Sequence, residues 1–246
     1  MRAPAPFYSW QAHLAIDLPD ARALFTTRRG GCSTGPYALL NLGRLTDDEP
    51  AAVERNRAAL RAMVGAPLAE IRQVHGSEVI RLTEPPNGAG APPEADGQAT
   101  ALAGVAALVL VADCLPIAVA GQGVVAMLHA GWRGLAAGVV DEGVRSVREL
   151  GADGPLTAAI GPGAGPCCYE VGDEVHASFA ARHGASARRG GNLDLKAIAR
   201  AELARAGVGT VHDAGICTIC SDPSLLFSHR RDRGITGRQA GVAWLK

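Results

Sequence analysis

The sequence predicts a fold of the α/β (α+β) class, because two kinds of segment are mixed along the whole chain. Short runs that are continuously apolar or that alternate with polar residues are typical of β-strands. Longer segments with apolar residues three and four positions apart are typical of amphipathic helices. The chain has 246 residues, of which 48% are hydrophobic, and this is enough to bury a large core. We expect one domain over residues 1–246.

The predicted strands are short apolar or β-branched runs. The run at residues 105–111 is uninterrupted, which predicts a strand that is buried on both faces. The two runs after it are separated by Gly121-Gln122-Gly123, a sequence typical of a turn. The complete set of predicted strands is 71–82 (one strand or a bent pair), 105–111, 115–120, 124–128, 156–160, 208–212 and 242–245. The segment 85–93 is rich in proline and glycine and is predicted to be a loop within the domain.

Four segments have helical periodicity. In residues 49–64, Val53, Leu60 and Val64 fall on one side and arginines on the other. The segment 132–150 likewise separates valines and leucines from acidic residues and arginines. The complete set of predicted helices is 49–64, 132–150, 171–183 and 193–206, the last ended by Gly207.

Composition indicates which partners to expect. Lys+Arg and Asp+Glu both number 24, so no excess of positive charge favours nucleic acid or an anionic membrane. The sequence has no run of about 18 apolar residues and no apolar signal segment near residue 1, so we expect a cytoplasmic protein. Six cysteines are too few for a dense disulfide framework in a chain of this length. The expected assembly is a monomer or a small homo-oligomer.

Two imidazoles and one thiolate lie at the edges of apolar runs. They are His75, Cys114 and His129. Their wide separations do not match a zinc finger, but they match ligands from separate strands whose ends converge. This ligand set suits Zn²⁺ in a catalytic site with one open position, and it also suits copper. Two alternatives remain open: Cys114 as a nucleophile with a histidine base, or three ordinary buried side chains.

Other segments carry weaker signals. Asp113 is a candidate for orienting a ligand imidazole, provided that the strand bends there. Arg133 lies between two glycines at a predicted helix start, where it could hold an anion or where the glycines simply permit close packing. The polar clusters 26–31 and 228–232 could line a pocket or form solvated loops.

The remaining cysteines have no assigned role. Cys167 and Cys168 are adjacent, and most such pairs are structural thiols. Cys217 and Cys220 form a CxxC motif without a second CxxC. The motif is therefore interpreted as half of a zinc site at most, or as a redox pair.

Many ordered blocks between Phe25 and Leu245 resemble the YfiH-like family. This family is known as the laccase-domain or multicopper polyphenol oxidase family, and also as purine nucleoside phosphorylases and peptidoglycan editing factors. The matching blocks are 25–31, 40–43, 56–57, 73–76, 95–97, 112–117, 129–134, 160–162, 169–172, 217–218 and 236–239.

The resemblance implies a fold and a metal site. The fold would be a single domain of mixed β-sheets flanked by helices, similar to cytotoxic necrotising factor deamidases. Zinc would be bound by His75, Cys114 and His129. The implied reactions are phosphorolysis of adenosine, inosine, guanosine and methylthioadenosine, and deamination of adenosine. Phenol oxidation with copper and editing of peptidoglycan precursors by a cysteine or zinc hydrolase are the alternatives.

From these observations we expect a zinc-dependent purine nucleoside enzyme. Its partners would be small purine nucleosides and phosphate. The expected catalytic and metal-binding residues are His75, Cys114 and His129. The expected substrate-binding residues are Arg28, Asn41, Arg57, Arg133 and Arg238, with Arg133 ranked first for phosphate.

Three positions depart from the family pattern. His229 replaces a tyrosine in the family block, Cys32 stands where valine is common, and Cys220 is an additional thiol. These departures bear on the preferred substrate and not on the metal ligands.

Overall fold

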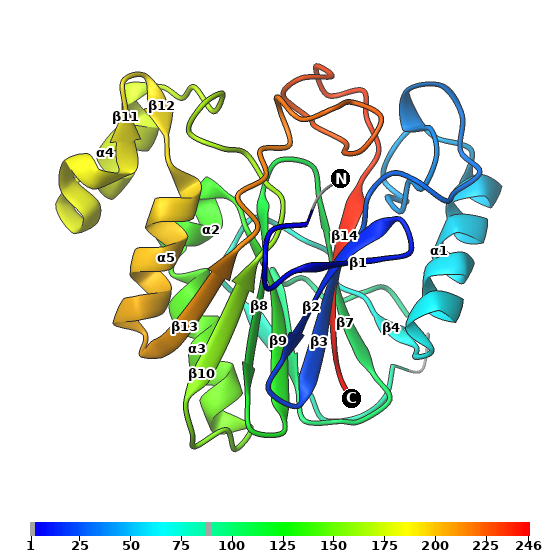
Figure 1. Ribbon diagram of the computed structural model, residues 1–246, viewed down its shortest axis with the longest axis horizontal. Coiled ribbons are helices and arrows are strands. Elements are labelled where there is room, and N and C mark those ends of the chain that lie inside the picture. Colours follow the sequence, from blue (N-terminus) through cyan, green and yellow to red (C-terminus); the bar gives the residue numbers. More distant parts are fainter. Residues whose placement is uncertain (1–2, 87–89) are drawn as a thin grey trace.

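The computed structural model describes residues 3–86 and 90–246. It is a mixed α/β domain in which two six-stranded sheets are covered by helices on their outer sides (Figure 1). The first sheet has the order β1 (Tyr8–Trp10), β2 (His13–Leu18), β3 (Ala21–Phe25), β14 (Gln239–Leu245), β7 (Ala106–Val111) and β4 (Leu68–Ala69). The second has the order β13 (Val208–Asp213), β10 (Leu156–Ile160), β8 (Leu115–Gly121), β9 (Val124–Ala130), β6 (Gly97–Thr100) and β5 (Val79–Leu82).

Five α-helices accompany the two sheets in the described part of the chain. The described residues form α1 (Pro50–Val64), α2 (Trp132–Ala137), α3 (Val139–Glu149), α4 (Asp173–His183) and α5 (Leu195–Arg205). Two 3₁₀ turns, η1 (Gly35–Tyr37) and η2 (Gly184–Ala187), and a small hairpin of β11 (Arg188–Arg189) and β12 (Asn192–Leu193) complete these elements. Among the described residues, no helix has both the length and the apolar character that a membrane span requires.

Three apolar clusters define the layers. One cluster lies between the sheets and includes Phe25, Val109 and Met127. A second packs α1 against the first sheet, and a third packs α3 and α5 against the second sheet. Alternate residues of β7 and β8 therefore point into different clusters, since successive side chains of a strand face opposite sides of a sheet. This double burial explains the uninterrupted apolar runs.

Most of the predicted strands are confirmed, but the sequence missed several strands and misjudged the segment 71–82. The strands at 105–111, 115–120, 124–128, 156–160 and 208–212 are present within a residue or two, and the last strand begins earlier, at Gln239. The segment 71–82 is wrong as a single strand, because only its end, Val79–Leu82, is a strand. Strands β1, β2, β3, β4 and β6 had no predicted counterpart. Within the predicted loop 85–93, residues 87–89 lie outside the described part, and the rest of the loop contains no helix or strand.

All four predicted helical segments contain helices, but one of them is divided into two helices. The segment 132–150 is wrong as a single helix, because Gly138 has a φ of 92° and ends α2 in a left-handed conformation. That conformation is favourable for glycine and not for other residues. The helices predicted at 171–183 and 193–206 begin at Asp173 and Leu195, and the side chain of Asp194 accepts a hydrogen bond from the Ala197 N–H at the start of α5.

Candidate metal centre and its pocket

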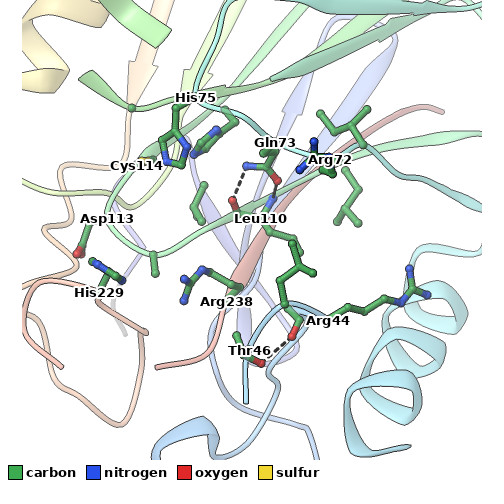
Figure 2. A pocket seen from close by; sticks show the side chains of 18 of the residues that line it. Arg44, Thr46, Arg72, Gln73, His75, Leu110, Asp113, Cys114, His229 and Arg238 are labelled. Atoms are coloured by element: carbon green, nitrogen blue, oxygen red, sulfur yellow. Dashed lines mark hydrogen bonds between the residues drawn. The ribbon is translucent and has the colours of Figure 1, made fainter. Parts of the chain in front are cut away.

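A pocket of about 680 Å³ opens where loops from both sheets meet. Figure 2 shows His75 and Cys114 together at one end of it, with Arg238 and Arg44 farther along. The walls come from loop segments and strand ends that are distant in sequence. They include residues 43–46, 70–73, His75, 110–114, His129, 131–133, Tyr169, 229–230 and Arg238.

His75, Cys114 and His129 converge at this pocket as the sequence predicted. Their potential ligand atoms all lie within 4.8 Å of one another. The two imidazole rings meet edge to face with their centroids 4.9 Å apart. His129 is buried, Cys114 is half-buried and His75 is exposed. A Cβ atom at Gly131 would lie 2.8 Å from the Cys114 sulfur, so only glycine allows the helix start to approach the thiol this closely.

The sharp turns that present these ligands are made by non-glycine residues. His75 has a φ of 61° and Asp113 has a φ of 91°. Such left-handed conformations cost free energy in residues other than glycine and persist only where surrounding contacts hold them. At both turns a buried carboxylate supplies those contacts.

Asp96 holds the His75 turn and the His129 ring at the same time. Its fully buried carboxylate accepts the N–H groups of Val74, His75 and Gly76 at 3.2, 3.0 and 2.6 Å. It also lies 2.7 Å from His129 Nδ1. With Nδ1 donating to Asp96, Nε2 is the nitrogen of His129 that could bind a metal ion in place of a proton. Asp96 had no predicted role, because only the folded chain shows that this acid is buried between two candidate ligands.

The thiol and the imidazole next to it form a charged pair. Burial alone would raise the pKa of Cys114, but His129 and His75 outweigh it and lower the pKa to about 6. Burial alone would lower the pKa of His129, but the Cys114 thiolate and Asp96 raise it to about 9. The pocket therefore favours a thiolate, which is the form of cysteine that binds metals and acts as a nucleophile.

Asp113 does not orient a ligand imidazole, so that expectation is corrected. Its carboxylate accepts the Thr218 hydroxyl at 2.6 Å and the Arg230 backbone N–H at 2.7 Å. The left-handed turn directs the side chain toward these two loops. Asp113 therefore fastens the rim of the pocket beside Cys114.

Of the five predicted substrate-binding residues, Arg133 and Arg238 line the pocket with accessible guanidinium groups. Arg133 is exposed and stacks on the Trp132 ring at 4.3 Å. Arg238 is half-buried and donates to the Thr236 and Gly237 carbonyls, both at 3.0 Å. Burial lowers the pKa of Arg238, against the opposing effects of Cys114 and Asp113.

Arg57 also borders the pocket, but it is committed to the protein. Its side chain is 3% exposed and pairs with Glu70 at 2.6 Å. A second nitrogen donates to the Leu42 carbonyl at 2.6 Å. Arg57 is therefore a supporting residue of the pocket wall and a poor candidate for phosphate.

Arg28 and Asn41 do not belong to the lining residues of this pocket, so the structure does not bring them to the candidate site. Arg28 donates to the carbonyls of Ala38, Pro223 and Pro36. Asn41 is fully buried, and its amide bonds to four neighbouring protein groups. Buried polar groups are normally satisfied in this way, so both residues stabilise loops.

The rim carries further polar side chains. His229 and Arg230, from the polar cluster 228–232 that the sequence offered as a pocket wall, line the pocket together with Tyr169. Burial raises the pKa of Tyr169 to about 12, so its hydroxyl remains a hydrogen-bond donor at neutral pH. Arg230 lies over the Tyr169 ring at 5.2 Å, which restricts the orientation of that side chain.

Two mixed sheets with a histidine and cysteine pocket at their loop edge define an α/β protein with a candidate metal site. The family model described as "Multi-copper polyphenol oxidoreductase laccase" matches residues 22–246. The chain therefore belongs to this YfiH-like, laccase-domain family, as its sequence blocks indicated.

Relatives support this assignment over nearly the full length. The chain is 42% identical to a protein named "Purine nucleoside phosphorylase" from Xylella fastidiosa strain Temecula1, with 92% of this chain and 93% of that protein covered. It is 38% identical to "Purine nucleoside phosphorylase YfiH" from Escherichia coli K12, with 91% and 93% covered. The crystal structure of YlmD from Geobacillus stearothermophilus superposes with a TM-score of 0.90 at 36% identity, covering 99% of this chain and 100% of that one.

Proposed function

We propose that this protein is a zinc-dependent purine nucleoside phosphorylase that also deaminates adenosine. The observation that carries the proposal is the convergence of His75, Cys114 and His129 at one end of a 680 Å³ pocket. A cavity of this size is typical of sites for small molecules. The phosphorylase names of the relatives support the same substrate class. Adenosine, inosine, guanosine and methylthioadenosine are the proposed nucleosides.

The residues present fit a zinc ion. Two imidazoles and one thiolate are a typical three-ligand set for catalytic zinc, and the Asp96 contact presets the His129 tautomer. A zinc ion held by His75, Cys114 and His129 would supply Lewis acidity at this end of the pocket. In this proposal the three side chains act as ligands and keep the reacting end of the nucleoside beside them.

The chain's own polar groups would position the two substrates. Arg133 and Arg238 offer positive charge on the pocket wall, where they would hold phosphate near the ribose. The protonated hydroxyl of Tyr169 would donate a hydrogen bond to the purine or the ribose. Trp132 lines the same wall and offers an apolar surface for the base.

One assay separates the proposed reactions. Purified protein is incubated with adenosine, with and without phosphate, and the products are separated by chromatography. Adenine formed only with phosphate would support phosphorolysis, and inosine formed without phosphate would support deamination. The zinc-ligand variant Cys114→Ser is expected to lose both products. If wild-type protein forms neither product from any of the four nucleosides, the purine proposal is wrong.

Copper-dependent phenol oxidation is a second candidate. The description of the matched family favours it, and two imidazoles with one thiolate also resemble a copper ligand set. Adding Cu²⁺ and a phenol under air, with oxygen uptake measured, tests this candidate. Uptake that persists in Cys114→Ser would show that free copper, and not this site, oxidises the phenol.

A hydrolase that edits peptidoglycan precursors is a third candidate. The depressed pKa of Cys114 beside His129 is typical of an activated cysteine nucleophile. Muropeptide amides offered to the wild-type protein and to Cys114→Ser would test this activity. The cytoplasm, expected from the sequence, would give access to nucleosides and to such precursors alike.

A further inference from the structure

Four cysteines form a second thiol cluster that the proposed function does not use. Cys167 and Cys168 follow β10, and Cys217 and Cys220 follow β13. Their sulfur atoms all lie within 4.8 Å of one another. The pair Cys167–Cys220 and the pair Cys167–Cys168 are each separated by 3.5 Å between sulfurs. The CxxC motif therefore finds its missing half in a vicinal pair about fifty positions earlier, which corrects its interpretation as a half site.

The spacing of the sulfurs matches a tetrahedral metal site and is wider than the bond of a disulfide. Zinc–sulfur bonds of about 2.3 Å in a tetrahedron place sulfurs about 3.8 Å apart. A disulfide needs a separation of about 2.05 Å, and all six cysteines of the structure are free. The four thiols thus surround a position at which one metal ion could bind all four sulfurs.

The surrounding backbone is built to bring the two loops together. Gly163 pairs with Cys217 in an isolated β-bridge. The Gly165 N–H donates to the Cys217 sulfur at 3.2 Å, a contact that stabilises a thiolate. A Cβ atom at Gly165 would lie 3.3 Å from the sulfurs of both Cys167 and Cys217, so a larger residue there would crowd the cluster.

We propose that one structural zinc site cross-links the loops after β10 and β13. Its ligands would be Cys167, Cys168, Cys217 and Cys220. Binding would form four zinc–sulfur bonds and release the thiol protons to solvent, with no change of oxidation state. Four protein ligands leave no open position, which is typical of a structural site and not of a catalytic one.

This zinc site would stabilise one wall of the pocket, because residues next to its cysteines contact the pocket. Tyr169, which lines the pocket, follows Cys168 directly. Thr218, which follows Cys217, donates to Asp113 beside the ligand Cys114. The site would therefore fix one wall of the pocket, and it stands whether or not the proposed nucleoside chemistry is correct.

The first test counts metal ions. Native mass spectrometry of protein purified without chelator is expected to show about two zinc ions per chain, one at each cluster. The double variant Cys167→Ser/Cys220→Ser and the single variant Cys114→Ser are each expected to lose one ion. Cys32→Ser is the matched control, since Cys32 is an exposed free cysteine outside both clusters, and it should retain both ions. Iron in place of zinc, or the same metal content in wild type and double variant, would overturn the proposal.

The second test uses the wild-type chain and so does not depend on the folding of a variant. Alkylation followed by mass spectrometry reports which thiols react before and after a strong chelator. Cys167 and Cys220 are exposed, yet they are expected to be protected until the chelator removes zinc, whereas exposed Cys32 reacts in both samples. Cobalt substitution should add the absorption of tetrahedral thiolate coordination. Equal reactivity of Cys167, Cys220 and Cys32 before chelation, or a disulfide within the cluster, would contradict a zinc site.

Discussion

Asp96 connects the two candidate imidazole ligands through one buried carboxylate. It bonds to three consecutive backbone N–H groups around His75 and to the His129 ring. His129 and these N–H groups lower the pKa of Asp96 and outweigh its burial, which acts in the opposite direction. The carboxylate therefore stays ionised, which suits a residue that orients a ligand histidine.

Replacing Asp96 by asparagine is expected to weaken zinc binding by about 10- to 100-fold, the usual effect of losing such a positioning contact. The amide turns one acceptor into a donor that faces the backbone N–H groups. Competition with a chromophoric chelator measures the affinity of the His75, Cys114 and His129 site. Asp47→Asn is the control, because Asp47 is exposed. Unchanged affinity in Asp96→Asn would show that the contact does not support metal binding.

Arg133 is the residue through which phosphate binding can be tested with little risk to the fold. It is exposed and stacks only on Trp132 among the aromatic rings described. Arg133→Ala is expected to raise the KM for phosphate roughly tenfold, the scale of one lost charge-assisted hydrogen bond, while the KM for the nucleoside changes little. The exposed Arg29→Ala is the control, since Arg29 is not among the pocket residues. Equal phosphate KM values for both variants would show that phosphate does not bind at Arg133.

The break between α2 and α3 shows how a single residue limits an element. The apolar periodicity continues across residues 132–150, and it correctly predicts which faces are buried. The left-handed φ of Gly138 interrupts the backbone without disturbing that periodicity. The pattern of apolar side chains shows which face of a helix is buried. Whether the helix continues depends on backbone angles, and glycine can adopt angles that end a helix. The start of α5 is decided by a different local contact.

Asp194 is the N-terminal cap of α5. Its carboxylate accepts the Ala197 N–H at 2.9 Å, and the residue is 6% exposed. Asp194→Ala is expected to lower the free energy of unfolding by about 1 kcal/mol, the usual cost of losing such a cap. Asp194→Asn keeps an acceptor oxygen and should lose much less. Urea unfolding monitored by circular dichroism measures both, and equal losses in the two variants would argue against a capping role.

At the scale of the whole molecule, the contact between the two sheets holds the domain together. Phe25, Val109 and Met127 belong to one cluster although they come from distant parts of the chain. Such contacts close long loops, so they form only in the folded state. Folding also buries His13, a titratable residue at the start of β2.

His13 is expected to make the domain less stable at acid pH. It is 3% exposed, and its Nδ1 accepts the Thr27 N–H at 3.1 Å. Burial lowers the pKa of His13 to about 4, so between about pH 6.5 and 4 the unfolded chain binds a proton that the folded chain does not. Stability is complete above that range and falls as the pH drops through it, by up to ~3 kcal/mol.

Urea unfolding at several pH values tests this dependence on His13. The variant His13→Gln retains an acceptor but does not titrate, so its stability should decline less than that of the wild type over this range. The difference between the two curves of stability against pH gives the contribution of His13, because the carboxylates and the metal ligands are the same in both proteins. Parallel curves would contradict the assignment.

Residue identity and periodicity were sufficient for the central strands and for helix α1, and they marked His75, Cys114 and His129 as candidate ligands that the family resemblance then singled out. Each of these depends on local spacing or on the intrinsic chemistry of a side chain, and both are written in the linear chain. Strands β1 to β4 and β6 were not predicted. Their local patterns carry little signal, and pairing with neighbouring strands holds them in the sheets.

Only the tertiary structure decided which polar groups face the pocket and which serve the fold. Arg28, Arg57 and Arg133 carry the same guanidinium group, yet Arg28 and Arg57 donate it to backbone carbonyls, whereas Arg133 is exposed on the pocket wall. Likewise, only the folded chain brings Asp96 to His129 and the pair Cys167 and Cys168 to the CxxC motif. Burial and partnership are properties of long-range contacts, so the sequence specified the available chemistry and the fold determined where it is used.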